Sequence, residues 1–152
     1  MPSWFYIFVG GGLGSMCRYA MSVWLPRATA AHFPWATLAA NALGCLLIGL
    51  WLGYLEARPS RLLALLFVTG FCGGFTTFST FSADTLGLLR QGLYLAAATY
   101  AAVSLLGGLL LAGCGYWLSI RLFMHCPWLS IIYIYEEKRT RQPLAAIPRQ
   151  HN

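Results

Sequence analysis

Hydroxyl-bearing residues and phenylalanines crowd together in the stretch GFCGGFTTFSTF, which runs from Gly70 to Phe81 in an otherwise apolar part of the chain. A glycine pair, Gly73 and Gly74, followed by closely spaced Thr and Ser residues favours helix poorly, so we expect a helix to break there. Carbonyls freed by such a break suit a small cation, whereas freed N–H groups, hydroxyls and the positive edges of phenyl rings suit an anion. The stretch therefore predicts a site that binds ions.

Two other apolar segments carry polar side chains at helical spacing. Thr37 and Asn41 are four residues apart, as are Tyr100 and Ser104, so each pair shares one face of a helix. A polar side chain in hydrocarbon is costly unless it is paired or lines a wet path. A single Ser or Thr more often bonds to a carbonyl of its own helix, but polar faces on three segments favour a common path.

Arg18 is a fixed positive charge within an apolar run. It could be a structural anchor that bonds to carbonyls, or a group that raises the anion concentration in a vestibule. The residues alone leave both interpretations open.

The sequence lacks the signs of an enzyme. His32, His125 and His151 lie outside the apolar runs, and no Ser/His/Asp, Cys/His or HExxH arrangement occurs. The five cysteines are odd in number and have no CxxC spacing, so we interpret them as apolar filler. We expect no catalytic residue.

The elements that would carry these side chains are membrane helices. Of the 152 residues, 59% are hydrophobic and 9% are charged, which is too apolar for a soluble domain of this size. Four stretches are long enough to cross a bilayer, which takes about 20 helical residues; they are residues 4–25, 33–55, 62–89 and 93–120. We therefore predict an all-α membrane protein with four transmembrane helices and a break in the third.

The domain organisation follows from these spans. Residues 1–121 form one four-span domain with short linkers, and residues 122–152 form a C-terminal extension that is partly interfacial and disordered at its end. The net charge of +6 comes from basic residues scattered at span ends and in the tail, which suits lipid headgroups better than nucleic acid.

The orientation signal is weak. One side of the membrane receives Arg58, Arg61 and Arg121, and the other receives Arg27 and Arg90. A chain with so little bias can insert both ways round, which would allow two copies to pair antiparallel. Small residues four apart would let helices approach closely; they are Gly10 and Gly14, Gly49 and Gly53, and Gly70 and Gly74.

Three motifs resemble, in order and spacing, those of the Fluc (CrcB) family of fluoride channels. They are GGLGSMCRY (11–19), FPWATLAANALG (33–44) and GFCGGFTTFSTF (70–81). The resemblance covers roughly residues 4 to 121 and leaves the tail unexplained. It implies a multi-pass protein of the bacterial inner membrane, an antiparallel dimer with two fluoride pores, and a structural Na+ at the dimer interface.

The resemblance also implies roles for single residues. Carbonyls of Gly73 and Thr76 would hold Na+, and Arg18 matches the first-span arginine of the family. Phe78 and Phe81 would present ring edges to fluoride, and Asn41 would line the pore. The complete set of expected pore residues is Asn41, Phe78, Phe81, Thr37, Tyr100, Ser104, Thr77 and Ser79. Ala36 and Gly108 depart from the pattern, because the family usually has a glycine and a hydroxyl there.

The function expected from the resemblance is a passive, fluoride-selective channel that exports fluoride and confers fluoride resistance. One alternative is a dual-topology antiporter that exchanges a small molecule for protons, for which Asp84 is the nearest carboxylate. Another is a structural protein whose small-residue faces merely pack. The partner subunit could be an identical copy or a sister chain.

Overall fold

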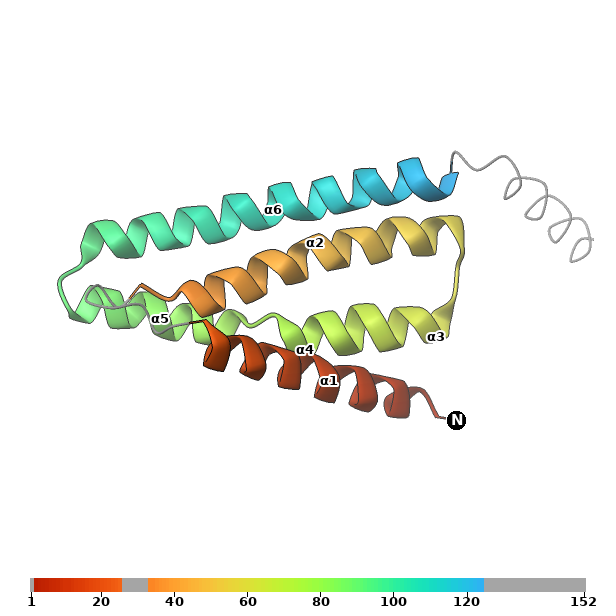
Figure 1. Cartoon of the computed structure of the whole chain (residues 1–152), viewed down its shortest axis with the longest axis horizontal. Helices are drawn as coiled ribbons and strands as arrows, with labels where there is room; N and C mark the ends of the chain where they lie inside the picture. The colour runs from red at the N-terminus through yellow and green to blue at the C-terminus, as the bar shows by residue number, and fades with distance from the viewer. Residues whose placement is uncertain (1, 26–32, 125–152) are drawn as a thin grey trace, which may run out of the picture.

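The computed structural model describes residues 2–25 and 33–124, and all secondary structure within these ranges is helical (Figure 1). The all-α class is therefore confirmed for the described residues. Three helices are long: α1 (Ser3–Trp24), α2 (Trp35–Ala57) and α6 (Tyr94–Met124). The expected extension after residue 121 falls almost entirely outside the described ranges, so its interfacial and disordered character stays a prediction.

The expected third span is assembled from several pieces. Its first half consists of α3 (Arg61–Leu63), the wider π-helix η1 (Ala64–Cys72) and α4 (Gly73–Phe75), and its second half is α5 (Phe78–Arg90). Ser60 starts the first half, since its hydroxyl accepts a hydrogen bond from the Leu63 N–H at 3.4 Å. Thr76 and Thr77 separate the two halves.

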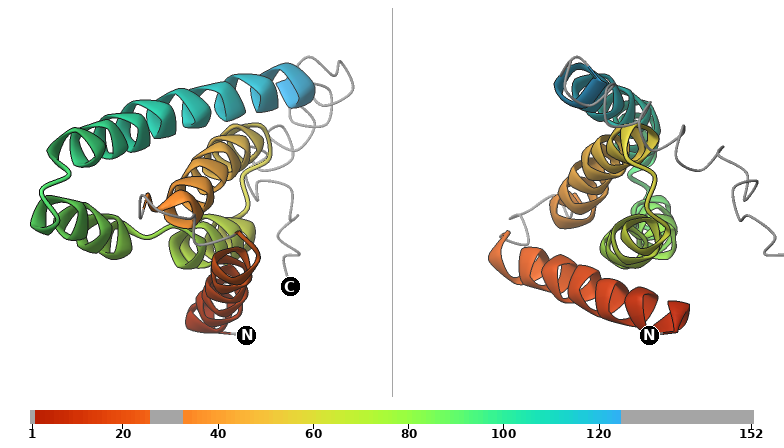
Figure 2. Two further views of the ribbon diagram at one scale, coloured as in Figure 1. Left: turned by 60° about the vertical axis from the view of Figure 1, so that its left-hand side comes forward. Right: turned by 90° about the vertical axis from the view of Figure 1, so that its right-hand side faces the viewer.

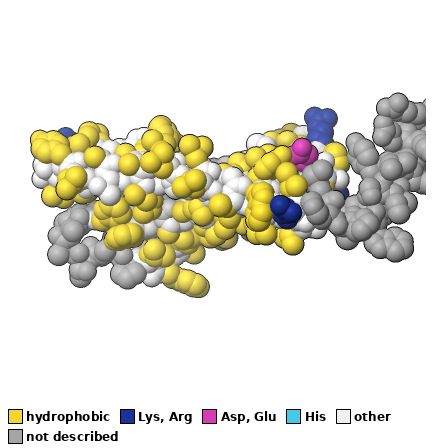
Figure 3. All heavy atoms as spheres, turned by 90° about the horizontal axis from the view of Figure 1, so that it is seen from above, with side chains coloured by type: hydrophobic (Ala, Val, Ile, Leu, Met, Phe, Trp, Pro, Cys, Tyr) yellow, Lys and Arg dark blue, Asp and Glu magenta, His cyan; other side chains and the backbone are white. Residues whose placement is uncertain are grey.

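Three segments of the described chain are long and apolar enough to cross a membrane, namely Trp35–Ala57, Arg61–Arg90 and Tyr94–Phe123. They correspond to the expected second, third and fourth spans. Hydrophobic side chains cover much of the molecular surface, while the charged side chains visible from above gather towards its ends (Figure 3). The 22-residue α1 is a regular helix but is not among these three, so its crossing of the membrane remains a prediction.

The helices pack as two parallel pairs. Helix α6 lies along α2, and α1 lies along η1 and α4 (Figures 1 and 2). The broken third span joins the pairs, because its first half contacts α1 and α2 while α5 contacts α6. The ends of α2 and α6 and the start of α3 lie together, which brings Arg58, Arg61 and Arg121 to one end of the molecule.

Glycines set the distance between the paired helices. A Cβ at Gly10 would overlap the Leu66 carbonyl oxygen, and a Cβ at Gly14 would overlap that of Phe71. On the α2–α6 contact, a Cβ at Gly49 would overlap the Ala112 carbonyl oxygen. The expectation that glycines four apart mark close helix contacts is confirmed here, because a Cβ at Gly10, Gly14 or Gly49 would meet the backbone of a neighbouring helix.

The interruption lies just after the glycine pair and not within it. Gly73 has helical dihedral angles (φ −63°, ψ −36°), whereas Thr76 (φ −82°, ψ 154°) and Thr77 (φ −149°, ψ 115°) are extended. Gly74 serves the contact with α1, where a Cβ would overlap the Gly11 carbonyl oxygen. The glycine pair thus allows helix packing, and the two threonines form the break.

The glycine contact between α2 and α6 predicts the effect of one methyl group. Gly49→Ala should lower the free energy of unfolding by about 1–3 kcal/mol, because the new Cβ forces the backbones apart at Ala112. Thermal unfolding of the purified protein in detergent measures this. The matched control is Gly113→Ala on α6, where a Cβ meets nothing within 4 Å. Equal melting temperatures for both variants would contradict the close contact.

Candidate functional site

The break in the third span is held by one side chain of α2. The Asn41 Oδ1 accepts a hydrogen bond from the Thr77 N–H at 2.8 Å, and the Asn41 Nδ2 donates to the Thr77 carbonyl at 3.2 Å. An unpaired backbone group costs free energy comparable to a lost hydrogen bond, so these two bonds replace what the helix gives up. Asn41 lies on α2 in reach of Thr77 because α2 crosses the third span at this level.

The break also removes the carbonyls of four residues, 73 to 76, from the helical ladder, and two of them matter most here. In an unbroken helix the Thr77 N–H would donate to the Gly73 carbonyl and the Thr80 N–H to the Thr76 carbonyl. Here the Thr77 N–H donates to Asn41, and the Thr80 N–H donates to the Thr77 Oγ1 at 3.2 Å. The carbonyls of Gly73 and Thr76 therefore lose the donors that a continuous helix would supply, and they can accept from another group.

Thr77 also begins α5. Its Oγ1 caps the helix by accepting from the Thr80 N–H, and it lies 3.1 Å from the hydroxyls of both Ser79 and Thr80. Thr76 is fixed separately, since its hydroxyl donates to the Cys72 carbonyl at 2.8 Å. Hydroxyls of the TTFST segment are thus largely used to hold the break.

A cavity of about 260 Å³ opens on one side of the break. It is lined by Asn41, Gly44, Cys45, Ile48, Thr76, Thr77, Phe78, Phe81, Ser104 and Leu105. None of these ten lining residues carries a charge. The Ser104 Oγ is buried and has no hydrogen-bond partner among the described residues, so it can still donate to a small anion.

Aromatic rings follow one another along this side of α5. The Phe78 and Phe81 rings lie 5.6 Å apart between centroids, and the Phe81 and Tyr100 rings lie 5.2 Å apart. Phe78 is 75% exposed, whereas Tyr100 is completely buried in a cluster with Leu88 and Ala97. The rings thus pass from the surface of the subunit to its interior.

A second cavity of about 260 Å³ lies on the other side of the break. It is lined by Ser15, Arg18, Tyr19, Ser22, Ala36, Thr37, Thr77 and Thr80. The Arg18 Nε is buried and has no hydrogen-bond partner among the described residues. This atom therefore makes no anchoring bond to a carbonyl of the described chain. Arg18 gives this cavity a positive charge that the first cavity lacks.

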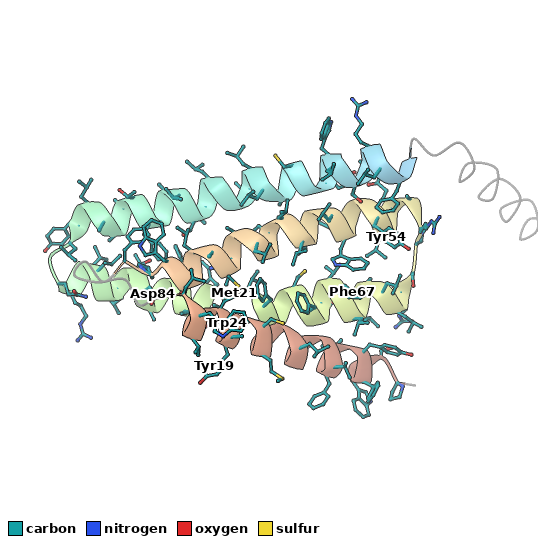
Figure 4. All side chains as sticks on the ribbon, in the orientation of Figure 1. Tyr19, Met21, Trp24, Tyr54, Phe67 and Asp84 are labelled. Carbon is teal, nitrogen blue, oxygen red and sulfur yellow. The ribbon has the colours of Figure 1, made fainter. Side chains whose placement is uncertain are left out.

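The structure gathers most of the expected site residues around Thr77, which lines both cavities. Asn41, Thr76, Phe78, Phe81 and Ser104 line the first cavity, and Arg18 and Thr37 line the second. Gly73, Ser79 and Tyr100 are not in either lining. Tyr100 instead contacts the Phe81 ring, and its hydroxyl lies 3.5 Å from Asp84 Oδ2. Asp84 lies on α5 (Figure 4).

Several lining residues were not expected from the sequence. Gly44, Cys45 and Ile48 follow Asn41 by three, four and seven positions, which is the spacing of one helical face. This periodicity could have identified them, but their small or apolar side chains give no chemical signal. Thr80 lines the second cavity although it is not among the expected site residues.

The cap on α5 makes a testable prediction. Thr77→Val should weaken the start of α5 by about 1 kcal/mol, because valine cannot accept the hydrogen bond from the Thr80 N–H. Amide hydrogen exchange at the start of α5 should become about fivefold faster if a local opening governs it. Thr77→Ser keeps the acceptor and serves as the control. Unchanged exchange in Thr77→Val would show that the cap does not stabilise the break.

Known proteins match the part of the chain that contains the break and both cavities. A family model described as CrcB-like protein, Camphor Resistance (CrcB), matches residues 5–116. The fluoride-specific ion channel FluC of Phocaeicola vulgatus is 43% identical over 124 residues, which cover 78% of this chain and 99% of that protein. The FluC of Azotobacter vinelandii is 49% identical over 111 residues, which cover 72% and 90%.

A third relative, fluoride-specific ion channel FluC 2 of Listeria monocytogenes, is 44% identical over 119 residues, which cover 77% of this chain and 90% of that protein. The matched region contains nearly all of α1, all of α2 and the broken third span, and most of α6. With the break and both cavities inside the match, the chain belongs to the CrcB family.

Proposed function

We propose that this protein is a passive, fluoride-selective ion channel that exports fluoride and lowers its cytoplasmic concentration. The observation that carries the proposal is the first cavity, whose ten lining residues combine an amide, hydroxyls and phenyl rings with no charged side chain. The names of the relatives, which are fluoride-specific ion channels, support the same function. The protein is a channel and not an enzyme.

Fluoride is small and strongly hydrated, so its transfer into a medium of low dielectric constant costs on the order of tens of kcal/mol without replacement ligands. Asn41 has one side-chain N–H left after its bond to the Thr77 carbonyl, and the Ser104 hydroxyl is unpartnered among the described residues. The edges of Phe78 and Phe81 add positive electrostatic potential. These weak, neutral sites could replace water in steps without trapping the ion.

Arg18 would act before the ion reaches this path. Its charge in the second cavity would raise the local concentration of anions, and Thr77 lines both this cavity and the first. A charge in the vestibule attracts fluoride, whereas a charge within the narrow path would bind it too tightly for conduction. We therefore assign Arg18 to the vestibule.

Passive export is sufficient for resistance. Fluoride enters cells as neutral HF and dissociates at the higher internal pH, and the trapped ion can then leave through a channel. We place the protein in the bacterial inner membrane, with α1 as the first of four spans. The two subunits would be antiparallel, since the arginine bias between the two ends is weak. The second subunit is a copy of this chain or a sister chain.

A structural Na+ between the two subunits would fit the break. The carbonyls of Gly73 and Thr76 lack their helical donors because Asn41 and the Thr77 hydroxyl take those N–H groups. Gly73 is exposed, and a Cβ there would meet nothing nearer than the Val68 carbonyl oxygen at 4.0 Å. Carbonyl oxygens are hard ligands of the kind that a small cation prefers. Bound Na+ would neutralise their partial charges next to the anion path.

Antiport is less well supported. Asp84 lines neither of the two cavities, and its Oδ2 faces the hydroxyl of the buried Tyr100 at 3.5 Å. A coupled transporter needs a carboxylate that meets both the proton and the substrate. In this arrangement Asp84 meets the ring cluster of α5 and α6 instead.

Fluoride efflux from liposomes that hold the purified protein tests the proposal. With KF inside, a fluoride electrode should record rapid release once valinomycin lets K+ follow, and vesicles loaded with KCl should release almost no chloride. Release that needs the ionophore indicates that fluoride moves as an uncompensated ion. Fluoride release driven against its own electrochemical gradient by an imposed proton gradient would favour the antiporter, and no release from folded protein would refute the channel.

Two substitutions test the path itself. Phe81→Ile removes a ring edge, and Asn41→Asp replaces the amide donor with a carboxylate that repels fluoride and cannot donate to Thr77. Each should reduce fluoride efflux at least about tenfold while the protein remains folded. Phe8→Ile, at a phenylalanine on α1 that is 75% exposed, is the matched control. Wild-type efflux from both path variants would exclude these side chains from the pore.

A further inference from the structure

We propose that Gly44 is a positioning residue for the anion path, because the space above it seats the methyl group of Thr76 and so sets where the break lies against α2. The inference rests on the proposed function, since it concerns how that path keeps its shape. Gly44 is buried on α2 and lines the first cavity together with Thr76.

The seat is the space that a Cβ at Gly44 would fill, and the Thr76 methyl group occupies it. A Cβ at Gly44 would overlap the Thr76 Cγ2, and it would lie 3.6 Å from the Thr76 Cβ and 3.3 Å from the Phe75 Cδ1. The Thr76 methyl therefore occupies the volume that any other residue at position 44 would fill. Phe75, which borders the same space, is 3% exposed and is therefore itself packed by neighbours.

The orientation of Thr76 leaves little freedom to move aside. Its hydroxyl donates to the Cys72 carbonyl at 2.8 Å, which sets the rotation of the side chain. With the hydroxyl turned back to its own helix, the methyl group points to α2. A side chain at position 44 would therefore have to displace the backbone at Thr76 or break this hydrogen bond.

Helix α2 holds two consecutive residues of the break from one face. Asn41 binds the Thr77 backbone with two hydrogen bonds, and Gly44, three residues later, receives the Thr76 methyl. The first contact fixes the polar groups of the break, and the second fixes its distance from α2. Phe78 follows directly, so a shift at Thr76 moves the first ring of the path.

Gly44 contacts a different segment from the one that the other close glycines of α2 contact. A Cβ at Gly49 meets the backbone of Ala112, and a Cβ at Gly53 lies 3.0 Å from the Tyr116 carbonyl oxygen, so both belong to the contact with α6. Gly44 meets side chains of Phe75 and Thr76. Its substitution should disturb the break more than the packing of α2 on α6.

The experiment compares Gly44→Ala, Thr76→Ser and the double variant in the liposome assay. The initial rate reports throughput in each active vesicle, and the fraction of fluoride that is released reports how many vesicles hold a functional channel. Gly44→Ala should lower the rate by about tenfold or more at an unchanged active fraction, because small misplacements of binding groups have effects of this size. Thr76→Ser removes the Cγ2, so in the double variant the rate should recover at least about fivefold.

The controls separate this inference from the proposed function. Gly107→Ala on α6, where a Cβ meets nothing within 4 Å, should keep the parent rate. Absence of fluoride release from the parent protein would refute the proposed function. Release by the parent together with an unchanged rate in Gly44→Ala, or with no recovery in the double variant, would overturn the role of Gly44 and leave the channel intact.

Thr76→Ala is the second route if Gly44→Ala does not fold. It empties the seat and also removes the hydrogen bond to the Cys72 carbonyl, without adding an atom to α2. We expect a lower rate at an unchanged active fraction. The parent rate in this variant would show that seating Thr76 does not position the path, and would overturn the inference.

Discussion

The bond between Asn41 and the backbone of Thr77 is the interaction on which the site depends. A helix interrupted within an apolar span exposes backbone groups that have no water to bind, and only neighbouring protein, water in a cavity or an ion can satisfy them. Asn41 satisfies the donor and the acceptor of one residue at once. The carbonyls of Gly73 and Thr76 are left without their helical donors, because Asn41 takes the Thr77 N–H and the Thr77 hydroxyl takes the Thr80 N–H.

Close helix packing is the condition for that bond. The amide of Asn41 is short, so α2 must approach the third span within a few ångströms, and α1 must support the span from another side. Gly10 and Gly14 allow α1 to meet the backbone of η1, and Gly49 does the same for α2 and α6. In lipid, where helices gain little from hydrophobic association, such contacts supply much of the packing energy. The glycines therefore determine the precision of the site without touching an ion.

The division of charge between the two cavities explains how one small subunit could both attract and release an anion. Arg18 lies in the second cavity, and the first cavity is lined by neutral groups. Attraction over a distance needs charge, but passage needs ligands that bind weakly. Thr77 lines both cavities, so the break lies where the neutral cavity and the cavity with Arg18 share a residue.

The sequence by itself determined the helical class, three long apolar segments, the glycine contacts and the family, because hydropathy, residue spacing and motif order are properties of the local chain. The motif GGFTTFSTF also predicted an ion-binding site in the third span. Only the tertiary structure decided that Thr76 and Thr77, and not the glycine pair, form the break, and that Asn41 holds it. It also decided that Gly44 lies under Thr76. The reason is physical: which hydrogen bonds and contacts replace those of a helix depends on which neighbour reaches the backbone, and that is set by packing between segments far apart in the chain.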